Sequence, residues 1–143
     1  MSKPIITRAQ FPFWHTIEVR WGDMDAMGHV NNARYFTYCE AARIALLRQL
    51  DIRGRAEGSA FGPTLVATSC EYKREVRYPA TLDVGVRVTK LTERSFAMEY
   101  ALFFHGTEEV AAVASSVNAW VDYTVKKAVP LPDELREVLS RYQ

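Results

Sequence analysis

The stretch NNARYFTYCEAARIALLRQL, residues 31–50, decides the fold. Its apolar residues return at steps of four, three, four and four, which is the period of an amphipathic helix. The stripe consists of Tyr35, Cys39, Ala42, Leu46 and Leu50, widened by Phe36, Ile44 and Leu47. A helix of about 20 residues is roughly 30 Å long, and Asn31 is a candidate cap because its side chain can accept from unpaired amides of the first turn. A stripe of this length has to be buried against another large element.

The other periodic segments alternate every two residues, as half-buried β-strands do. One such segment, residues 15–21, precedes the helix, and a long region, residues 64–123, follows it. The rows that share one face there are Tyr72, Arg74, Val76 and Tyr78; Leu82, Val84, Val86 and Val88; Phe96, Met98, Tyr100, Leu102 and Phe104; and Ala111, Val113, Val117, Ala119 and Val121. Pro79 should end the first of these strands, and Gly106 marks a hairpin turn.

The order of the elements predicts one architecture. Consecutive strands joined by tight turns indicate an antiparallel meander, and a short helix follows Pro132, with Asp133 and Glu134 in its first turn, where the helix dipole favours negative charge. We predict an α+β fold in which a curved antiparallel sheet of about five strands wraps around one long central helix. We expect one domain, residues 1–143, with residues 1–13 as a loose lead-in.

Composition and charge exclude several classes of protein. The chain is 48% hydrophobic and 24% charged, close to the globular average. Lys and Arg number 18 against 17 Asp and Glu, so a general attraction to nucleic acid or anionic lipid is not indicated. No apolar run approaches the roughly 20 residues that span a bilayer, and residues 1–13 do not have the pattern of a signal peptide. Cys39 and Cys70 form neither a metal-ligand nor a disulfide pattern, which favours reduced thiols in a cytoplasm.

The segment GDMDAMGHVNN, residues 22–32, is where chemistry is expected, because it lies between a strand end and a helix start. Asp23 and Asp25 supply carboxylates that can act as base or nucleophile. The helix start offers unpaired amides to a carbonyl oxygen that gains negative charge. The same residue types are common in turns and caps, and Gly28 could simply supply a positive φ. Spacing alone does not separate a capping aspartate from a catalytic one.

Residues 19–36, VRWGDMDAMGHVNNARYF, followed by EAAR at 40–43, resemble the opening of the 4-hydroxybenzoyl-CoA thioesterase family. These are acyl-CoA thioesterases of the hotdog fold, and the later strand order agrees with them over nearly the whole chain. The resemblance implies hydrolysis of an acyl-CoA, with coenzyme A as part of the substrate and no separate cofactor. It places the catalytic carboxylate at Asp25, the oxyanion-binding amide at Asn32 and the loop glycine at Gly28. Asp23 is then expected mainly to support the loop.

The resemblance also implies contacts with the substrate. Family members bind coenzyme A near subunit boundaries through basic and hydroxyl residues in the turn between their third and fourth strands. The matching candidates are Lys90, Arg94 and Ser95, and the alternative is an ordinary solvated turn. Aromatic residues such as Tyr35, Phe61, Tyr72 and Trp120 are candidates for the acyl pocket, although most of them are expected to belong to the core. No His, Cys or carboxylate cluster has metal-ligand spacing, so we predict no metal.

The chain departs from some relatives, which have apolar or aromatic residues at His29 and a tyrosine–histidine pair at Asn31 and Asn32. His29 is a secondary candidate for a general base, because the ordinary pKa of histidine is about 6.5. The alternative is a structural histidine that forms hydrogen bonds beside the helix start.

Assembly and the exact reaction are further expectations. One helix covers only one face of a sheet, and the open edges and apolar residues such as Phe103 and Trp120 need cover, so we expect a homodimer with a continuous sheet, or a homotetramer. Other candidate functions are a hotdog hydratase or dehydratase, which usually needs a carboxylate–histidine pair, and a non-catalytic acyl-CoA or lipid-binding module. The sequence leaves open a small aromatic or a fatty acyl group, coenzyme A or acyl carrier protein, and Asp25 as nucleophile or as base.

Overall fold

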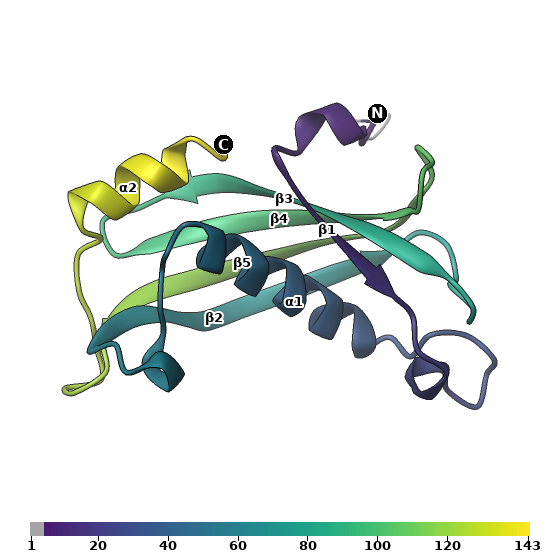
Figure 1. The fold of residues 1–143 in the computed structure, drawn as a ribbon, viewed down its shortest axis with the longest axis horizontal. Coiled ribbons are helices and arrows are strands. Elements are labelled where there is room, and N and C mark those ends of the chain that lie inside the picture. The colour runs from purple at the N-terminus through teal and green to yellow at the C-terminus, as the bar shows by residue number, and fades with distance from the viewer. Residues whose placement is uncertain (1–4) are drawn as a thin grey trace.

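A computed structural model describes residues 5–143 and shows a curved antiparallel sheet with one long helix packed across it (Figure 1). The main elements are β1 Phe13–Glu18, α1 Arg34–Gln49, β2 Phe61–Tyr72, β3 Thr81–Leu91, β4 Ser95–Phe104, β5 Val110–Asp122, β6 Lys127–Ala128 and α2 Asp133–Ser140. Short 3-10 helices lie at Arg8–Gln10, Trp21–Asp23 and Arg55–Glu57. Residues 1–4 of the expected lead-in lie outside the described part of the chain. The predicted α+β architecture, with a long and a short helix, is confirmed.

Helix α1 buries the face that its apolar period predicts. Its buried residues are Tyr35, Tyr38, Cys39, Ala42, Arg43, Leu46 and Leu47. Of the residues expected to widen the stripe, Phe36 is only half-buried and Ile44 is 40% exposed. The cap predicted at Asn31 is wrong in position: its side-chain oxygen accepts from the Ala33 amide at 2.9 Å and so closes the turn that precedes α1.

The sheet of residues 5–143 has the order β1-β3-β4-β5-β2, and β6 pairs with β5. Strands β3, β4 and β5 form the predicted meander, but β2 pairs with β5 instead of β3, so the meander prediction is wrong for β2. The strand expected to continue to Tyr78 ends at Tyr72. The Lys73 and Arg74 amides both donate to Ala111 O, which interrupts the regular pairing with β5, and Val76 O accepts from the Val30 amide instead. Residues 73–80 therefore connect the end of β2 to the start of β3, and β2 is an edge strand of the sheet.

The core lies between α1 and the sheet, where the predicted rows of β3 and β4 are buried as expected. In the row predicted for β5, Ala111 is buried in the core as expected, but from Val113 onward the row is wrong by one residue. The residues buried in that part of the sheet are Ala112, Ala114, Ser116, Asn118 and Trp120. A polar network explains this register, since the Tyr100 hydroxyl lies 2.7 Å from Ser116 Oγ and accepts from Arg43 at 3.2 Å. Buried polar groups that satisfy one another can face inward at little cost.

Part of the opposite face of the sheet, over β1, β3 and β4, is covered by the N-terminal segment, so the loose lead-in prediction is wrong for residues 8–11. Phe11 is buried and packs edge-on against Trp14 and Phe103, with ring centroids 6.1 and 6.5 Å apart. Arg8 lies over the rings of Trp14 and Phe103. Gly85 leaves the necessary space, because a Cβ there would lie 2.8 Å from the Phe11 ring. Phe103 is thus covered by its own chain, and the expectation that it needs a second subunit is wrong.

Trp120, the other residue expected to need cover, packs into the core between α1 and the sheet and is only 9% exposed. Phe103 and Trp120, the two apolar residues expected to need a second subunit, are therefore both buried within one chain.

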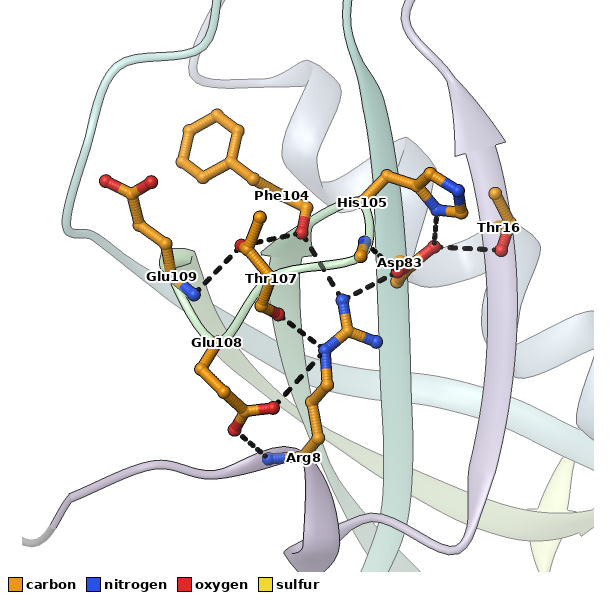
Figure 2. A network of polar contacts seen from close by, with 9 residues as sticks. Arg8, Thr16, Asp83, Phe104, His105, Thr107, Glu108 and Glu109 are labelled. Atoms are coloured by element: carbon orange, nitrogen blue, oxygen red, sulfur yellow. Dashed lines mark hydrogen bonds and ion pairs between the residues drawn. The ribbon is translucent and has the colours of Figure 1, made fainter.

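Asp83 ties the N-terminal segment to the sheet (Figure 2). Its carboxylate accepts from the Arg8 guanidinium at 2.7 Å and from Thr16 at 3.0 Å, and lies 2.8 Å from His105 Nδ1. The Gly106 amide adds a bond at 3.2 Å. Burial opposes ionisation of Asp83, but these bonds, with that to His105 the strongest, hold its pKa far below the usual range. His105 belongs to this network.

Candidate active site

The loop between β1 and α1 closes on itself as a small hairpin. Met24 and Val30 pair as an isolated antiparallel bridge, and the Asp25 amide donates to His29 O at 3.0 Å. The Gly28 amide donates to Asp25 O at 3.1 Å, and Gly28 has a φ of +88°. The positive φ considered for Gly28 is confirmed, since the turn needs a backbone conformation that favours glycine.

Asp23 holds the base of this loop. Its side chain is buried and accepts from the Arg20 amide at 3.0 Å and from the Tyr38 hydroxyl at 2.7 Å. The Arg20 and Arg34 guanidinium groups lie 3.3 and 3.8 Å from its other oxygen. Burial opposes ionisation, but the two hydrogen bonds and the Arg20 charge outweigh it and lower the pKa of Asp23. Because the bonds of its carboxylate go to Arg20, Arg34 and Tyr38 of the protein itself, Asp23 has the expected structural role.

Asp25 is placed differently, because it is half-buried and lines open space. One carboxylate oxygen accepts from the Met27 amide at 2.9 Å, and no residue of the described chain bonds the other. Asp25 lines a cavity of about 360 Å³ and also a neighbouring one of about 670 Å³. The residues that line the smaller cavity are Asp25, His29, Val30, Asn32, Tyr35, Tyr72, Lys73, Arg74 and Glu75. One carboxylate oxygen is thus available to a ligand.

Asn32 lines the smaller cavity, and its main-chain donor is unpaired within the described residues. Its N–H donates to none of residues 5–143. The carbonyl of the same peptide group, Asn31 O, accepts from the Arg34 amide at 2.9 Å. A fixed and unbonded amide before a helix can stabilise an oxygen that gains negative charge. The arrangement can therefore combine a carboxylate and an oxyanion donor at one reacting carbonyl.

The other residues predicted for the site, in the loop and at the start of α1, lie near Asp25 but have contacts of their own. His29 is half-buried, and its Nδ1 lies 3.5 Å from Val30 O; within the described chain no hydrogen bond joins its imidazole to the Asp25 carboxylate. Tyr35 is buried and packs edge-on against Tyr72, with ring centroids 4.9 Å apart. Burial raises the pKa of Tyr35 to about 12, so its hydroxyl stays neutral. Gly28 lines the larger cavity, not the smaller one.

The residues expected to contact coenzyme A lie at the other end of the sheet. Lys90 and Arg94 are exposed, and the Ser95 hydroxyl lies 2.6 Å from Thr92 Oγ1 inside its own turn. The first residue of β3 is at the end of the sheet near the loop, and the eleven residues of the strand cover roughly 30 Å. Figure 1 shows this turn beside α2, at the end of the sheet away from the start of α1. One protomer therefore does not bring these three residues to Asp25.

Four residues of the smaller cavity come from outside the predicted loop and helix and were not assigned a role from the sequence. They are Tyr72, named only as one of several aromatic residues able to line a pocket, and Lys73, Arg74 and Glu75. They reach the cavity because β2 pairs with β5 and the chain then turns past the start of α1, where the Val30 amide binds Val76 O. No local pattern contains that proximity.

The comparison with protein families decides the relationship: residues 19–139 match the family described as the thioesterase-like superfamily. The chain belongs to this superfamily. The thioesterase-like chain superposes on the PA5185 protein of Pseudomonas aeruginosa with a TM-score of 0.88 and 32% identity, covering 98% of this chain and 97% of that one. The hotdog fold is thereby confirmed.

Two further relatives of the thioesterase-like chain have named ligands or activities. A thioesterase of Thermus thermophilus, crystallised with coenzyme A and Zn, gives a TM-score of 0.79 at 31% identity over 93% of this chain and 95% of that one. The long-chain acyl-CoA thioesterase FadM of Escherichia coli (strain K12) is 27% identical over 125 residues, 87% of this chain and 95% of that protein. The thioesterase-like chain is a thioester hydrolase.

Two other expectations concern metals and membranes. Across residues 5–143, no group of three or more His, Cys, Asp or Glu side chains is arranged to hold a metal ion. No helix in that same part of the thioesterase-like chain has the length and apolar character required to cross a bilayer.

Proposed function

We propose that this chain hydrolyses an acyl-CoA, with Asp25 as the catalytic carboxylate and the Asn32 amide as the oxyanion donor. The observation that carries the proposal is that Asp25 and Asn32 line the same cavity of about 360 Å³. Within residues 5–143, one oxygen of the Asp25 carboxylate and the main-chain amide of Asn32 have no hydrogen-bond partner. Within the superfamily, the motif of residues 19–43 favours the 4-hydroxybenzoyl-CoA thioesterase family. The proposal includes no cofactor, since coenzyme A enters as part of the substrate.

The reaction needs few groups. The thioester carbonyl accepts from the Asn32 N–H, and losing one such donor typically costs about 3–4 kcal/mol of barrier. Asp25 either attacks the carbonyl carbon to give a mixed anhydride, which water then cleaves, or removes a proton from an attacking water. In both routes the C–S bond breaks and the thiolate leaves; its thiol has a pKa of roughly 8.5, by analogy with cysteine, so no strong acid is needed. His29 is a secondary candidate for the base.

The lining of the two cavities supports a small aromatic or a fatty acyl group. Tyr35 and Tyr72 give the smaller cavity an aromatic wall. Trp21, Met24 and Tyr78 give the larger one an apolar wall. Because Asp25 lines both, a thioester at this carboxylate has space for an arm on either side.

A homodimer through β2 is part of the proposal. Among residues 5–143 this 12-residue strand pairs with β5 alone, and it leaves Phe61, Leu65 and Val66 at least 45% exposed. A long apolar edge favours pairing with a second copy. Antiparallel pairing about a two-fold axis reverses the partner sheet. The turn carrying Lys90, Arg94 and Ser95 of the partner subunit would then come toward the Asp25 end, where it could bind coenzyme A phosphates. Pairing of two such dimers would give a tetramer.

Light scattering at micromolar concentration tests this assembly. A dimer or tetramer is expected, and Val66→Lys on the exposed edge should yield monomer. A monomeric wild-type protein would contradict the dimer without touching the assignment of Asp25.

The same proposal places the enzyme in a reducing cytoplasm, which suits its free cysteines, Cys39 and Cys70. Burial raises the pKa of Cys39 to about 12, so this thiol is a packing residue and no nucleophile.

Thiol release from a panel of aromatic, short-chain and long-chain acyl-CoAs, and from acyl carrier protein thioesters, tests the reaction. Wild type should release thiol, whereas Asp25→Asn should lose at least about a hundredfold in kcat with an unchanged thermal midpoint. Asp51→Asn is the matched control, because Asp51 is exposed at the far end of α1 and its φ of 58° suits asparagine. Full activity in a folded Asp25→Asn protein would reject Asp25. Water addition to enoyl-CoA would instead indicate a hydratase, and binding without turnover a non-catalytic module.

A further inference from the structure

We propose that Tyr72, the last residue of β2, is a positioning residue that fixes the oxyanion donor from across the sheet. Its hydroxyl donates to the Asn32 carbonyl at 2.9 Å. This inference rests on the proposed function, because it concerns the orientation of the Asn32 amide during thioester hydrolysis. Two peptide groups meet at the Asn32 Cα, and together they set that orientation.

Hydrogen bonds hold both of these peptide groups. In the group joining residues 31 and 32, the Asn31 carbonyl accepts from the Arg34 amide at 2.9 Å. In the group joining residues 32 and 33, the Asn32 carbonyl accepts from Tyr72, and the Ala33 amide donates to Asn31 Oδ1 at 2.9 Å. In the described chain, the Asn32 N–H is the one group of the four that is left unbonded.

Of the three bonds to these peptides, two are local to residues 31–34 and would move with the segment if it shifted. The Tyr72 bond spans 40 residues of sequence and connects the segment to the sheet. Together with the Asn31 amide, which donates to Asp23 O at 2.9 Å, it sets where the unbonded N–H lies relative to the rest of the cavity. A misplacement of about 1 Å in a catalytic group can cost a hundredfold in rate, so such an anchor has consequences for turnover.

Tyr72 is itself well fixed for this role. Its backbone pairs with Ala112 of β5, and its ring packs edge-on against Tyr35 of α1 at 4.9 Å and 82°. Tyr35 is buried in the core, so the ring rests on a rigid neighbour. Burial also raises the pKa of the Tyr72 hydroxyl, which keeps its proton and remains a donor at neutral pH.

The variant Tyr72→Phe tests the inference, because it keeps the ring and removes only the hydroxyl. Tyr123→Phe is a matched control: the Tyr123 hydroxyl makes the same kind of bond, to Pro63 O at 2.8 Å, near the opposite end of β2. We expect Tyr72→Phe to lower kcat about tenfold with KM within about twofold of wild type, and Tyr123→Phe to leave both unchanged.

A second readout does not depend on turnover. Hydrogen exchange of the Ala33 amide, followed by NMR, should be faster in Tyr72→Phe than in wild type or Tyr123→Phe, because the peptide loses its connection to the sheet. Both effects together support the positioning role.

Three results would overturn it. Unchanged kcat in Tyr72→Phe removes any role in turnover, a raised KM at constant kcat indicates a substrate contact, and unchanged Ala33 exchange shows that the peptide needs no anchor. A wild-type protein that hydrolyses no thioester on the panel overturns the proposed function itself, whereas an active wild type with any of these three results overturns only the role of Tyr72.

Discussion

The Tyr38 hydroxyl donates to the buried Asp23 carboxylate at 2.7 Å, which ties the loop carrying Asp25 to the second turn of α1. The loop thereby takes its position from the most deeply packed helix of the fold. Since Asp23 also accepts from the Arg20 amide at 3.0 Å, one side chain joins the end of β1, the loop and α1. The two aspartates of the motif thus divide the work, one supporting the loop and one facing open space.

Asp23→Ala should be strongly destabilising for this reason. It leaves the buried Tyr38 hydroxyl without its acceptor, and a buried group left unpaired costs about 1–3 kcal/mol. The Arg20 amide, which is only partly buried, loses its acceptor as well. Tyr38→Phe should cost less, because Asp23 keeps its bond to Arg20. Urea unfolding measures both. Tyr142→Phe, which removes an exposed hydroxyl bonded to Gln49, serves as control, and an Asp23→Ala protein as stable as this control would refute the anchor role.

Substitution at position 32 should separate the main chain from the side chain. Asn32→Ala is expected to retain hydrolysis, because the proposed donor is the backbone N–H. Asn32→Pro removes that N–H and should lower kcat by about a hundredfold to a thousandfold, as expected for the loss of one oxyanion donor. Proline is tolerated just before a helix, so circular dichroism should show an intact fold. Equal activity in the two variants would show that the oxyanion is bound elsewhere.

The Asp83 network predicts a defined pH dependence of stability. An aspartate has an ordinary pKa of about 3.9, and its pKa in the fold is lower, chiefly because hydrogen bonds led by that of His105 outweigh burial. The stabilising contribution is therefore complete above the ordinary value and is lost as the pH falls toward the folded value. The difference in free energy of unfolding between wild type and Asp83→Asn should narrow from about pH 6 to about pH 3. A constant difference over that range would argue against the network.

Gly85 and Phe11 should behave as a coupled pair. A Cβ at position 85 would lie 2.8 Å from Phe11 Cγ, so Gly85→Ala should cost about 1–3 kcal/mol as overpacking does. In a Phe11→Ala background the contact with Cγ is gone, although the Cβ of residue 11 at 2.9 Å and Trp14 at 3.0 Å remain, and the same substitution should cost less. A double-mutant cycle by thermal unfolding measures the difference. Strictly additive costs would mean that the N-terminal segment relaxes without loss.

The parts of the fold that could be predicted are those in which the neighbouring residues in the sequence determine which side chains are buried. Helix α1 and the inward rows of β3 and β4 have strong periods, and they lie where the periods place them. The register of β5 could not be read in the same way, because Ser116 and Asn118 face inward only in the presence of Tyr100 and Arg43. The place of β2 beside β5 is a long-range pairing that no local pattern contains.

In the candidate site, too, the residues in local motifs could be predicted and those brought in by long-range pairing could not. The loop from Gly22 to Asn32 could be selected from its polar residues and its position before the helix, and Gly28 has the positive φ considered for it. Tyr72 and Lys73 could not be placed there from the sequence, since they reach the cavity through the pairing of β2 and β5. Lys90 illustrates the reverse case, a candidate chosen by resemblance that one protomer leaves at the other end of the sheet.

The N-terminal cover has a consequence for synthesis of the chain. Arg8 emerges from the ribosome 75 residues ahead of its partner Asp83, and Phe11 emerges long before Phe103. Contacts between such distant positions form late, after the loops between them have closed. The first segment to be made is therefore among the last to dock, and a nascent chain that stalls before β4 is complete exposes Phe11 and Trp14 to the quality-control machinery of the cell.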